Sequence, residues 1–254
     1  MEIKQITFSP TGGTKKVADS VCKGLDIENM ECIDLCVPES KIAALTIGTD
    51  DIAVVAAPVF GGRIPALAVE RISRIKGNGA KCVVIAVYGN RAYDDALLEL
   101  RDVMTHAGYC VVAAIAAVAE HSIIRDYGAG RPDTEDIAEL GAMGGRIAEA
   151  IRQNNVNDKL SIPGNYPYKK TMGGPIPSAG KKCNECGTCA RACPVGAISL
   201  DNIHKTDKTK CISCMKCISV CPNSARKIDT AMHFAIKTML KDPCKERKVN
   251  ELHI

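Results

Sequence analysis

The first part of the chain alternates short apolar runs with stretches that have helical spacing. The run at 52–59 is continuously apolar, which is typical of a parallel strand covered on both faces. This alternation predicts an α/β fold, with a parallel sheet between two layers of helices. Five strands in this order favour the doubly wound arrangement, whose ligand crevice lies beyond the carboxyl ends of the strands. The predicted strands are 3–8, 30–35, 52–59, 82–88 and 109–118, and the predicted helices are 14–24, 66–75, 94–107 and 137–152.

The pattern changes after the last of these helices. Residues 154–182 contain four prolines and no sustained periodicity, which predicts a connecting segment. A cysteine-rich stretch follows, and then one helix at 230–240 and a charged tail. The expected organisation is a first domain at 1–155 (the sheet domain), a linker at 156–179, a small α+β domain at 180–228 (the cysteine domain), and a C-terminal helix and tail at 229–254.

Composition places the chain among globular proteins, with 46% apolar and 24% charged residues. No apolar run reaches the roughly 18 residues of a membrane span, so we expect no membrane insertion. The N-terminal stretch lacks the basic region, apolar region and cleavage site of a secretory signal. We therefore expect a cytoplasmic protein.

The chain has fourteen cysteines, which without a secretion signal favour metal or redox chemistry over disulfides. Eight of them form two runs of the type C-x-x-C-x-x-C-x-x-x-C-P, the pattern of bacterial ferredoxins with two [4Fe–4S] clusters. Three closely spaced thiolates surround one cluster, whereas the fourth points away and crosses to the other. One ligand set is therefore expected to be Cys183, Cys186, Cys189 and Cys221, and the other Cys211, Cys214, Cys217 and Cys193.

Zinc is the alternative, because it also takes four thiolates. Zinc sites use paired C-x-x-C knuckles, and these triplets with a trailing Cys-Pro favour the clusters. The remaining cysteines have no ligand spacing. We expect five of them to be small buried apolar residues and leave the role of Cys244 open. The five are Cys22, Cys32, Cys36, Cys82 and Cys110.

Charge is divided unevenly along the chain. Residues 1–155 carry 16 Lys and Arg against 21 Asp and Glu, whereas residues 156–254 carry 17 against 8. A basic half is also a feature of nucleic-acid binding. However, eight thiolates and two clusters would remove about four positive charges, because a metal's own charge belongs to the local sum. We therefore expect no nucleic-acid partner, and the opposite charges of the two domains would help to hold them together.

A glycine-rich loop separates the first strand from the first helix. Its hydroxyl and glycine residues form a cradle of N–H groups that suits a phosphate dianion. The loop lacks the Lys-Ser/Thr of a P-loop and the G-x-G-x-x-G of a dinucleotide site, which favours a monophosphate bound without a metal. The alternative is an ordinary strand–helix turn. The residues concerned are Ser9, Thr11, Gly12, Gly13 and Thr14.

Two further loops, at 57–63 and 88–93, follow the third and fourth strands and combine an aromatic residue with glycine. Phe60, Tyr88 and Tyr93 are three of the few aromatic residues in a chain with 4% aromatics. Their rings would lie beside a flat ligand while backbone amides approach its edge. Alternatively, the rings only cover the end of the sheet.

These three loops, taken in order, resemble those of flavodoxins, which implies FMN as the cofactor. Residues 9–14 are similar to the family's T/S-x-T-G-x-T signature, with Gly13 where Asn is common. The resemblance implies that Tyr93 stacks on the flavin ring and that the peptide at Gly61 reorients when flavin N5 gains a proton. The implied FMN ligands are Ser9, Thr11, Gly12, Gly13, Thr14, Pro58, Val59, Phe60, Gly61, Gly62, Gly89, Asn90, Arg91 and Tyr93.

One loop departs from that family. Its third loop is often acidic, but here it is Gly89-Asn90-Arg91. Because a less negative environment favours an anion, we predict a flavin whose reduced, anionic form is reached at a higher potential than in acidic flavodoxins.

The chain as a whole resembles the flavodoxin–ferredoxin fusions of anaerobic bacteria and archaea, the EFR-family ferredoxins. The expected function is electron transfer between two [4Fe–4S] clusters and FMN, linking one-electron carriers to another redox partner, a ferredoxin or an oxidoreductase. The alternatives are an FMN-dependent reductase of a small organic acceptor, a ferredoxin carrier with an empty docking domain, and a redox-regulated binding module. The chain's status as an enzyme, its catalytic residues and its oligomeric state stay open, and a homo-oligomer is compatible with the sequence. For the reductase, the polar residues placed to meet a substrate are Arg63, Arg91, His121 and Arg125.

Overall fold

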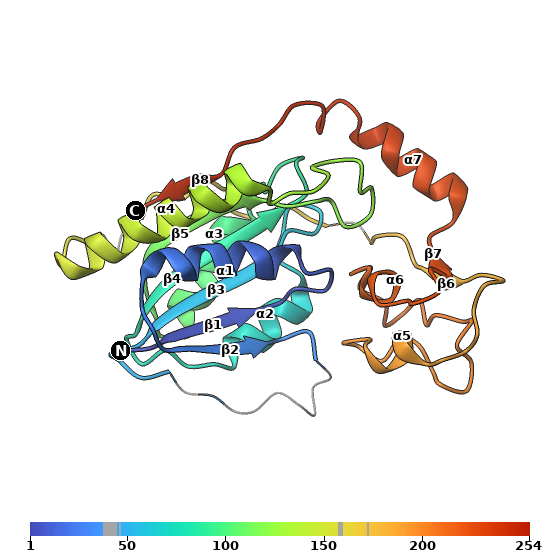
Figure 1. Ribbon diagram of the computed structural model, residues 1–254, viewed down its shortest axis with the longest axis horizontal. Helices are drawn as coiled ribbons and strands as arrows, with labels where there is room; N and C mark the ends of the chain where they lie inside the picture. The colour runs from blue at the N-terminus through green and yellow to red at the C-terminus, as the bar shows by residue number, and fades with distance from the viewer. Residues whose placement is uncertain (38–44, 46, 157–159, 172) are drawn as a thin grey trace.

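The computed structural model describes residues 1–37, 45, 47–156, 160–171 and 173–254. Its main feature is a sheet in the order β2-β1-β3-β4-β5-β8 (Figure 1). The first five of these strands are parallel, and their order is that of the flavodoxin-like doubly wound fold. They span Ile3–Thr7 (β1), Met30–Asp34 (β2), Ile52–Pro58 (β3), Lys81–Tyr88 (β4) and Cys110–Val118 (β5).

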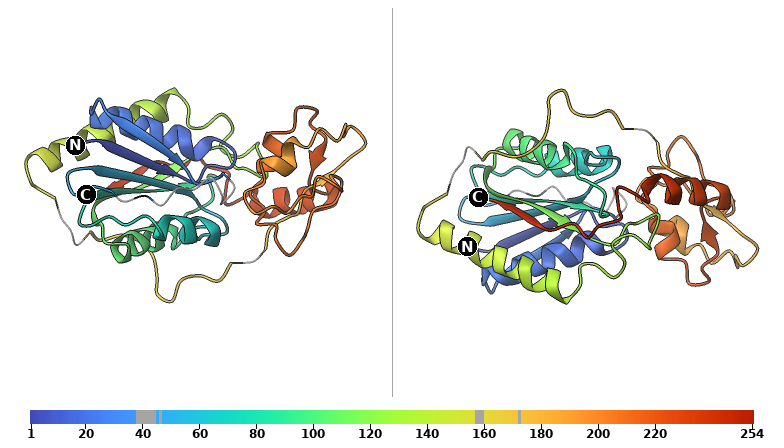
Figure 2. Two further views of the ribbon diagram at one scale, coloured as in Figure 1. Left: turned by 90° about the horizontal axis from the view of Figure 1, so that it is seen from below. Right: turned by 90° about the horizontal axis from the view of Figure 1, so that it is seen from above.

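Helices cover both faces of the sheet (Figure 2). One face is covered by α1 (Gly13–Leu25) and α4 (Thr134–Arg152), and the other by α2 (Ala66–Ser73) and α3 (Ala96–His106). Strands β3, β4 and β5 are buried almost throughout, which explains their continuous apolar runs. Helix α4 begins three residues before the predicted start, because Asp133 forms a capping box with Asp136.

The α1–α4 contact is close enough to exclude side chains. A Cβ atom placed on Gly24 of α1 would lie 2.0 Å from the carbonyl oxygen of Gly141 on α4. A Cβ atom on Gly144 would lie 2.3 Å from the carbonyl oxygen of Val21. The two helices therefore meet backbone against backbone, which the apolar pattern alone does not reveal.

The C-terminal tail corrects the expected five-stranded sheet. Glu251–His253 forms β8, which pairs antiparallel with β5 and makes the sheet six-stranded and mixed. Asn250 fixes this strand: its Oδ1 accepts from the Val118 N–H, and its Nδ2 donates to Asp136. Arg131 forms a buried ion pair with Asp136 and donates to the Lys248 carbonyl at 2.7 Å. Three residues are too few to show a strand pattern, so the sequence predicted only a charged tail here.

The linker is tied to α3. Asp95 accepts hydrogen bonds from the N–H groups of Asn165 and Lys169, at 2.8 and 2.6 Å. The hydroxyls of Tyr166 and Tyr168 both donate to Asp102. The described part of the linker therefore lies along the first domain in a fixed path.

The cysteine domain lies at the carboxyl ends of the parallel strands (Figure 1). Its helices are one turn each, α5 (Thr188–Arg191) and α6 (Lys216–Ser219). Its strand β7 (Arg226–Lys227) pairs antiparallel with β6 (Ser178–Ala179), which lies at the end of the linker. Helix α7 (Thr230–Leu240) follows and leads to the tail that returns to the sheet. The cysteine domain is therefore attached to the sheet domain at both of its ends.

Direct contacts join the two domains. Arg71, which is only 2% exposed, donates to the carbonyls of Leu35 and Val37 in the sheet domain and to that of Pro194 in the cysteine domain, the last at 2.9 Å. Lys216 Nζ donates to the Cys36 carbonyl at 3.2 Å.

None of the helices in the described part of the chain is long and apolar enough to cross a membrane.

Candidate functional site

The eight cysteines of the two runs line two separate hollows. Four of them line the first, here called the distal hollow: Cys183, Cys186, Cys189 and Cys221. The other four line the second, the proximal hollow: Cys193, Cys211, Cys214 and Cys217. In each hollow, the last cysteine of one run lies with the first three of the other. Among the described residues, no three His, Cys, Asp or Glu side chains are grouped as the ligands of a single metal ion.

Backbone amides point at the trailing cysteine of each run. The Ala197 N–H donates to Cys193 Sγ at 3.3 Å, and the Ala225 N–H donates to Cys221 Sγ at 3.2 Å. Burial would raise the pKa of the Cys221 thiol, but backbone N–H groups lower it by more. Such donors favour a thiolate, and hydrogen bonds to sulfur are among the factors that set cluster potentials.

A cavity of about 510 Å³ lies at the carboxyl ends of β1, β3 and β4. Its volume is within the range of small-molecule and cofactor sites. All three predicted loops contribute to its wall. The predicted FMN ligands that line it are Thr11, Gly13, Thr14, Pro58, Val59, Phe60, Gly61, Gly62, Gly89 and Arg91.

The start of α1 is suited to an anion. The helix has no acidic residue in its first turn, and Gly12, its N-cap, has a left-handed conformation (φ 93°) and offers no side-chain cap. By contrast, the start of α4 is neutralised by the Asp133 carboxylate. Thr11, Gly13 and Thr14 at the start of α1 line the cavity. The N–H groups and dipole of this helix therefore face a site that suits the phosphate of FMN.

Two glycines of the cavity wall lie too close to neighbouring atoms to be replaced by a residue with a side chain. A Cβ atom on Gly89 would lie 2.9 Å from the Cα atom of His121. Gly62 has φ 92°, and a Cβ atom there would lie 2.2 Å from a carboxylate oxygen of Asp94. These loops therefore require glycine, and they leave backbone exposed to a flat ligand. The donor set and the cavity size fit FMN.

His121 lines this cavity in a defined state. Its Nδ1 accepts from the N–H groups of Ile123 and Ile124, at 3.2 and 3.1 Å. The ring proton is therefore assigned to Nε2. Burial, together with the nearby positive charge of Arg91, lowers the pKa of His121 to about 4. The ring is thus a neutral hydrogen-bond donor at physiological pH.

Four predicted FMN ligands do not line the cavity. Ser9 and Gly12 belong to the phosphate loop behind it, and the Ser9 hydroxyl accepts from the Lys15 N–H at 2.9 Å. Asn90 is buried and binds the tail, donating to the carbonyls of Cys244 and Glu246. Tyr93 packs edge-on against Tyr88, and its hydroxyl donates to Glu251 at 2.7 Å.

The three arginines predicted to meet a substrate each form a salt bridge within the protein. Arg63 forms a salt bridge with Glu99, and Arg125 forms one with Glu120. Arg91 pairs with Asp94 while also lining the cavity.

Several cavity residues come from segments that the sequence reasoning assigned no site role. Lys169, Lys170 and 173–175 come from the linker, and Ile236, Met239, Leu240 and Pro243 come from α7 and the residues after it. The sequence signal that could have indicated a role for the linker in the site is the basic pair Lys169-Lys170 in an otherwise uncharged stretch. No local pattern indicates that α7 folds back to this cavity.

The remaining cysteines differ in burial: of the five expected to be buried, Cys22, Cys36 and Cys82 are buried and Cys110 is half-buried. Cys244 is buried, with its thiol 3.9 Å from the Gly89 carbonyl oxygen. Cys32 is exposed, which corrects the expectation that it is buried. Its strand, β2, is the edge of the sheet and has mostly exposed positions.

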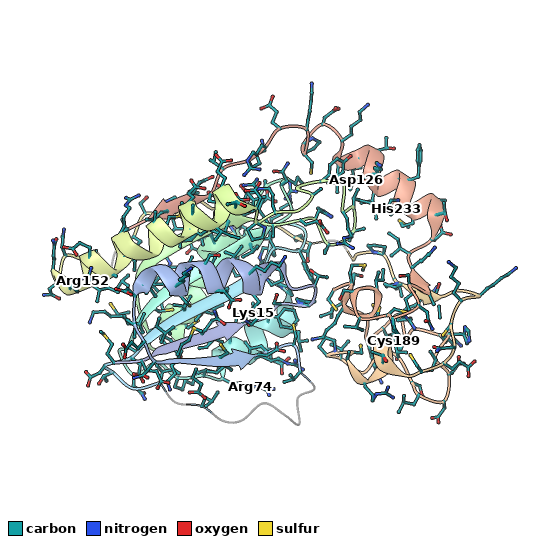
Figure 3. All side chains as sticks on the ribbon, viewed as in Figure 1. Lys15, Arg74, Asp126, Arg152, Cys189 and His233 are labelled. Carbon is teal, nitrogen blue, oxygen red and sulfur yellow. The ribbon has the colours of Figure 1, made fainter. Side chains whose placement is uncertain are left out.

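One residue belongs to both sites. Cys214 lines the proximal hollow and also the cavity at the carboxyl ends of the strands. The thiol positions of the proximal hollow are therefore adjacent to the cavity, whereas none of the distal cysteines lines it. Figure 3 shows Cys189, a distal cysteine, within the cysteine domain.

Comparison with known proteins gives a family match within the cysteine domain. Residues 182–226 match the family model of the 4Fe-4S dicluster domain. No curated protein matches the chain. Among solved structures, a flavodoxin from the domain Archaea has 15% identity and a TM-score of 0.41, over 60% of this chain and 99% of its own. A flavodoxin of Streptococcus pneumonia TIGR4 has 22% identity and a TM-score of 0.41, over 61% and 99%. Rubredoxin oxygen:oxidoreductase of Desulfovibrio gigas has 14% identity and a TM-score of 0.43, over 60% and 36%.

The chain thus joins a sheet of flavodoxin-like topology to a 4Fe–4S dicluster domain. Iron–sulfur domains of this kind are typical of electron-transfer proteins.

Proposed function

We propose that this protein passes electrons between two [4Fe–4S] clusters in the cysteine domain and an FMN in the sheet domain. The observation that carries the proposal is the position of Cys214, which lines both the proximal hollow and the cavity. A cluster held by Cys193, Cys211, Cys214 and Cys217 would be next to the flavin. The three cofactors would then form a series from the distal cluster through the proximal cluster to the flavin, with the distal cluster at its outer end.

The clusters exchange single electrons, whereas FMN takes up one or two, so the pair converts between one-electron and two-electron partners. The outer end of the series is accessible, because Cys186 is exposed. The hydroxyl of Thr188 lowers the pKa of the Cys186 thiol, which favours the thiolate that a cluster requires. A small one-electron carrier, such as a ferredoxin, is the kind of partner that would dock there.

The residues of the cavity have separate roles in this proposal. The start of α1 binds the phosphate, and 58–62 and Gly89 flank the ring. His121 donates one hydrogen bond from Nε2 and stays neutral. Lys169 from the linker and Leu240 from α7 lie across the cavity from the sheet and limit the access of water.

The fixed attachment of the cysteine domain supports transfer within one chain. Its two connections and the Arg71 and Lys216 contacts hold the proximal hollow beside the cavity. Electron transfer then needs no domain motion. The domain limits 1–155, 156–179, 180–228 and 229–254 belong to this proposal, with the tail acting as a second attachment.

The first test is composition. Protein purified without oxygen should contain about eight irons, about eight acid-labile sulfides and one FMN per chain. Eight irons without flavin, and no uptake of added FMN, would instead support a ferredoxin with an empty docking domain. Steady turnover of a small organic acceptor by the reduced protein would favour the reductase.

A further inference from the structure

Among the described residues, Arg226 is the largest fully buried side chain, with a relative exposure of 1%. It lies in β7 and lines the distal hollow. Nη1 donates to the Ile203 carbonyl at 2.8 Å, and Nη2 donates to the Pro177 carbonyl at 3.1 Å and to the Thr206 hydroxyl. These neutral partners fix the direction of the guanidinium plane.

The same side chain contacts both sets of cysteines. Arg226 Nη1 lies 3.6 Å from Cys189 Sγ, and Arg226 lines the distal hollow. A side-chain hydrogen bond also joins Arg226 to Cys217 of the proximal hollow. Arg226 Nε is buried and has no hydrogen-bond partner within the described chain.

A buried guanidinium without a counter-charge is costly. Among the described residues, no carboxylate lies within salt-bridge distance of Arg226. Its protein partners are carbonyls, a hydroxyl and thiol sulfurs. Thiolate-ligated clusters carry net negative charge, so both hollows would supply the missing counter-charge and an acceptor for the free Nε–H.

Building on the proposed function, we propose that Arg226 is the shared counter-cation of the two clusters and raises the reduction potential of both. A fixed positive charge stabilises the more negative, reduced state of each cluster, and N–H donors to cluster sulfur act in the same direction. Arg226 is a positioning residue in this sense, because it tunes the clusters and takes no part in the transfer itself.

The variant that tests this role is Arg226→Met, which keeps a long side chain and removes the charge. We expect the ratio of reduced to oxidised cluster at a fixed solution potential to fall at least tenfold, which is about 59 mV for a one-electron couple. Both clusters should shift, as followed by redox titration with electron paramagnetic resonance. The matched control is Lys227→Met, which removes the same charge from the exposed neighbouring residue and should shift the ratio much less.

A second measurement uses the unaltered sequence, so it does not depend on the variant assembling. In reduced protein labelled with ¹⁵N in the arginine guanidinium groups, pulsed electron paramagnetic resonance should detect ¹⁵N coupled to both cluster signals, and both couplings should weaken in Arg226→Lys. Missing ¹⁵N coupling, or equal potential shifts in Arg226→Met and Lys227→Met, would overturn the inference. If iron and sulfide are absent from the unaltered protein, the proposed function itself fails, which the iron assay distinguishes.

Discussion

Apolar side chains cover both faces of the strands in the sheet domain, whereas the cysteine domain has a very small apolar core. In the sheet domain, two large clusters of buried apolar residues lie above and below the sheet. The cluster in the cysteine domain has three buried members, Cys189, Ile198 and Ile203, one of which is itself an expected ligand. A domain of this size with so little apolar burial depends on its metal.

This difference shows that the two domains encode their folds in different ways. The sheet domain is specified by where apolar residues recur, and its cavity is formed by glycine loops at the strand ends. The cysteine domain is specified by the spacing of its ligands. The first is therefore expected to keep its fold without cofactors, and the second is not.

The largest expected effect follows from removal of iron. Chelation under denaturant-free conditions should unfold 180–228 while the sheet domain stays folded. Hydrogen exchange read by mass spectrometry should show rapid exchange in α5 and α6 and unchanged protection in β3 and β4. If α5 and α6 stay protected in iron-free protein, the cysteine domain keeps its fold without metal, as the sheet domain does, and our conclusion is wrong.

The second prediction concerns the tail that joins the domains. Arg131→Met leaves the buried Asp136 with only the longer ion pair to Arg247 at 3.3 Å, which should destabilise the sheet domain by about 3 kcal/mol. Since Arg131 also holds the Lys248 carbonyl, β8 should lose its protection from hydrogen exchange. Arg152→Met at the end of α4 is the control, because the Arg152 side chain is exposed and forms its ion pair with Glu149 at the surface. A loss of stability equal to that of the control would contradict the role of the pair.

The third prediction tests backbone packing in the sheet domain. Gly24→Ala should cost about 1–3 kcal/mol, because its Cβ would meet the Gly141 carbonyl and α1 would have to move away from α4. Gly145→Ala is the matched control, since its Cβ would meet the nearest atom at 3.8 Å and alanine favours helix. Thermal unfolding followed by circular dichroism separates the two. Equal melting temperatures would show that the helices are not in close contact.

The smallest effect concerns the pH dependence of the sheet domain. The pKa of His121 is about 4 in the folded protein and about 6.5 when unfolded, so only the unfolded state gains this proton as pH falls from 6.5 towards 4. Stability is therefore lost over that window. In His121→Asn the loss between pH 7 and 5 should be smaller, whereas His233→Asn on α7 should behave like the unaltered protein. Parallel pH profiles for all three would contradict the neutral, buried state of His121.

The sequence was most informative where the signal is local. Ligand spacing predicted both groups of cysteines that the structure brings together, and continuous apolar runs predicted β3, β4 and β5. The loop pattern predicted a role for Thr11, Gly13 and Thr14, which line the cavity. These features depend on residues close to one another along the chain.

The rest depends on contacts between distant segments. Strand β8 has three residues and pairs only because Asn250 and Arg131 fix it to the sheet domain. The linker reaches the cavity through Lys169, and α7 reaches it through Leu240. The inter-helix contact at Gly24 needs the partner glycines of α4, more than a hundred residues away. No local pattern carries this information.

The central claim is that electrons pass between the proximal cluster and the flavin inside one chain, next to Cys214. Rapid mixing of the oxidised protein with a limiting one-electron reductant should show cluster bleaching followed by flavin bleaching, at a rate that does not depend on protein concentration. In Cys214→Ser, with loss of the proximal cluster checked by iron assay, the flavin phase should disappear. Flavin bleaching at an unchanged rate in Cys214→Ser, or at a rate that rises with protein concentration, would contradict the claim.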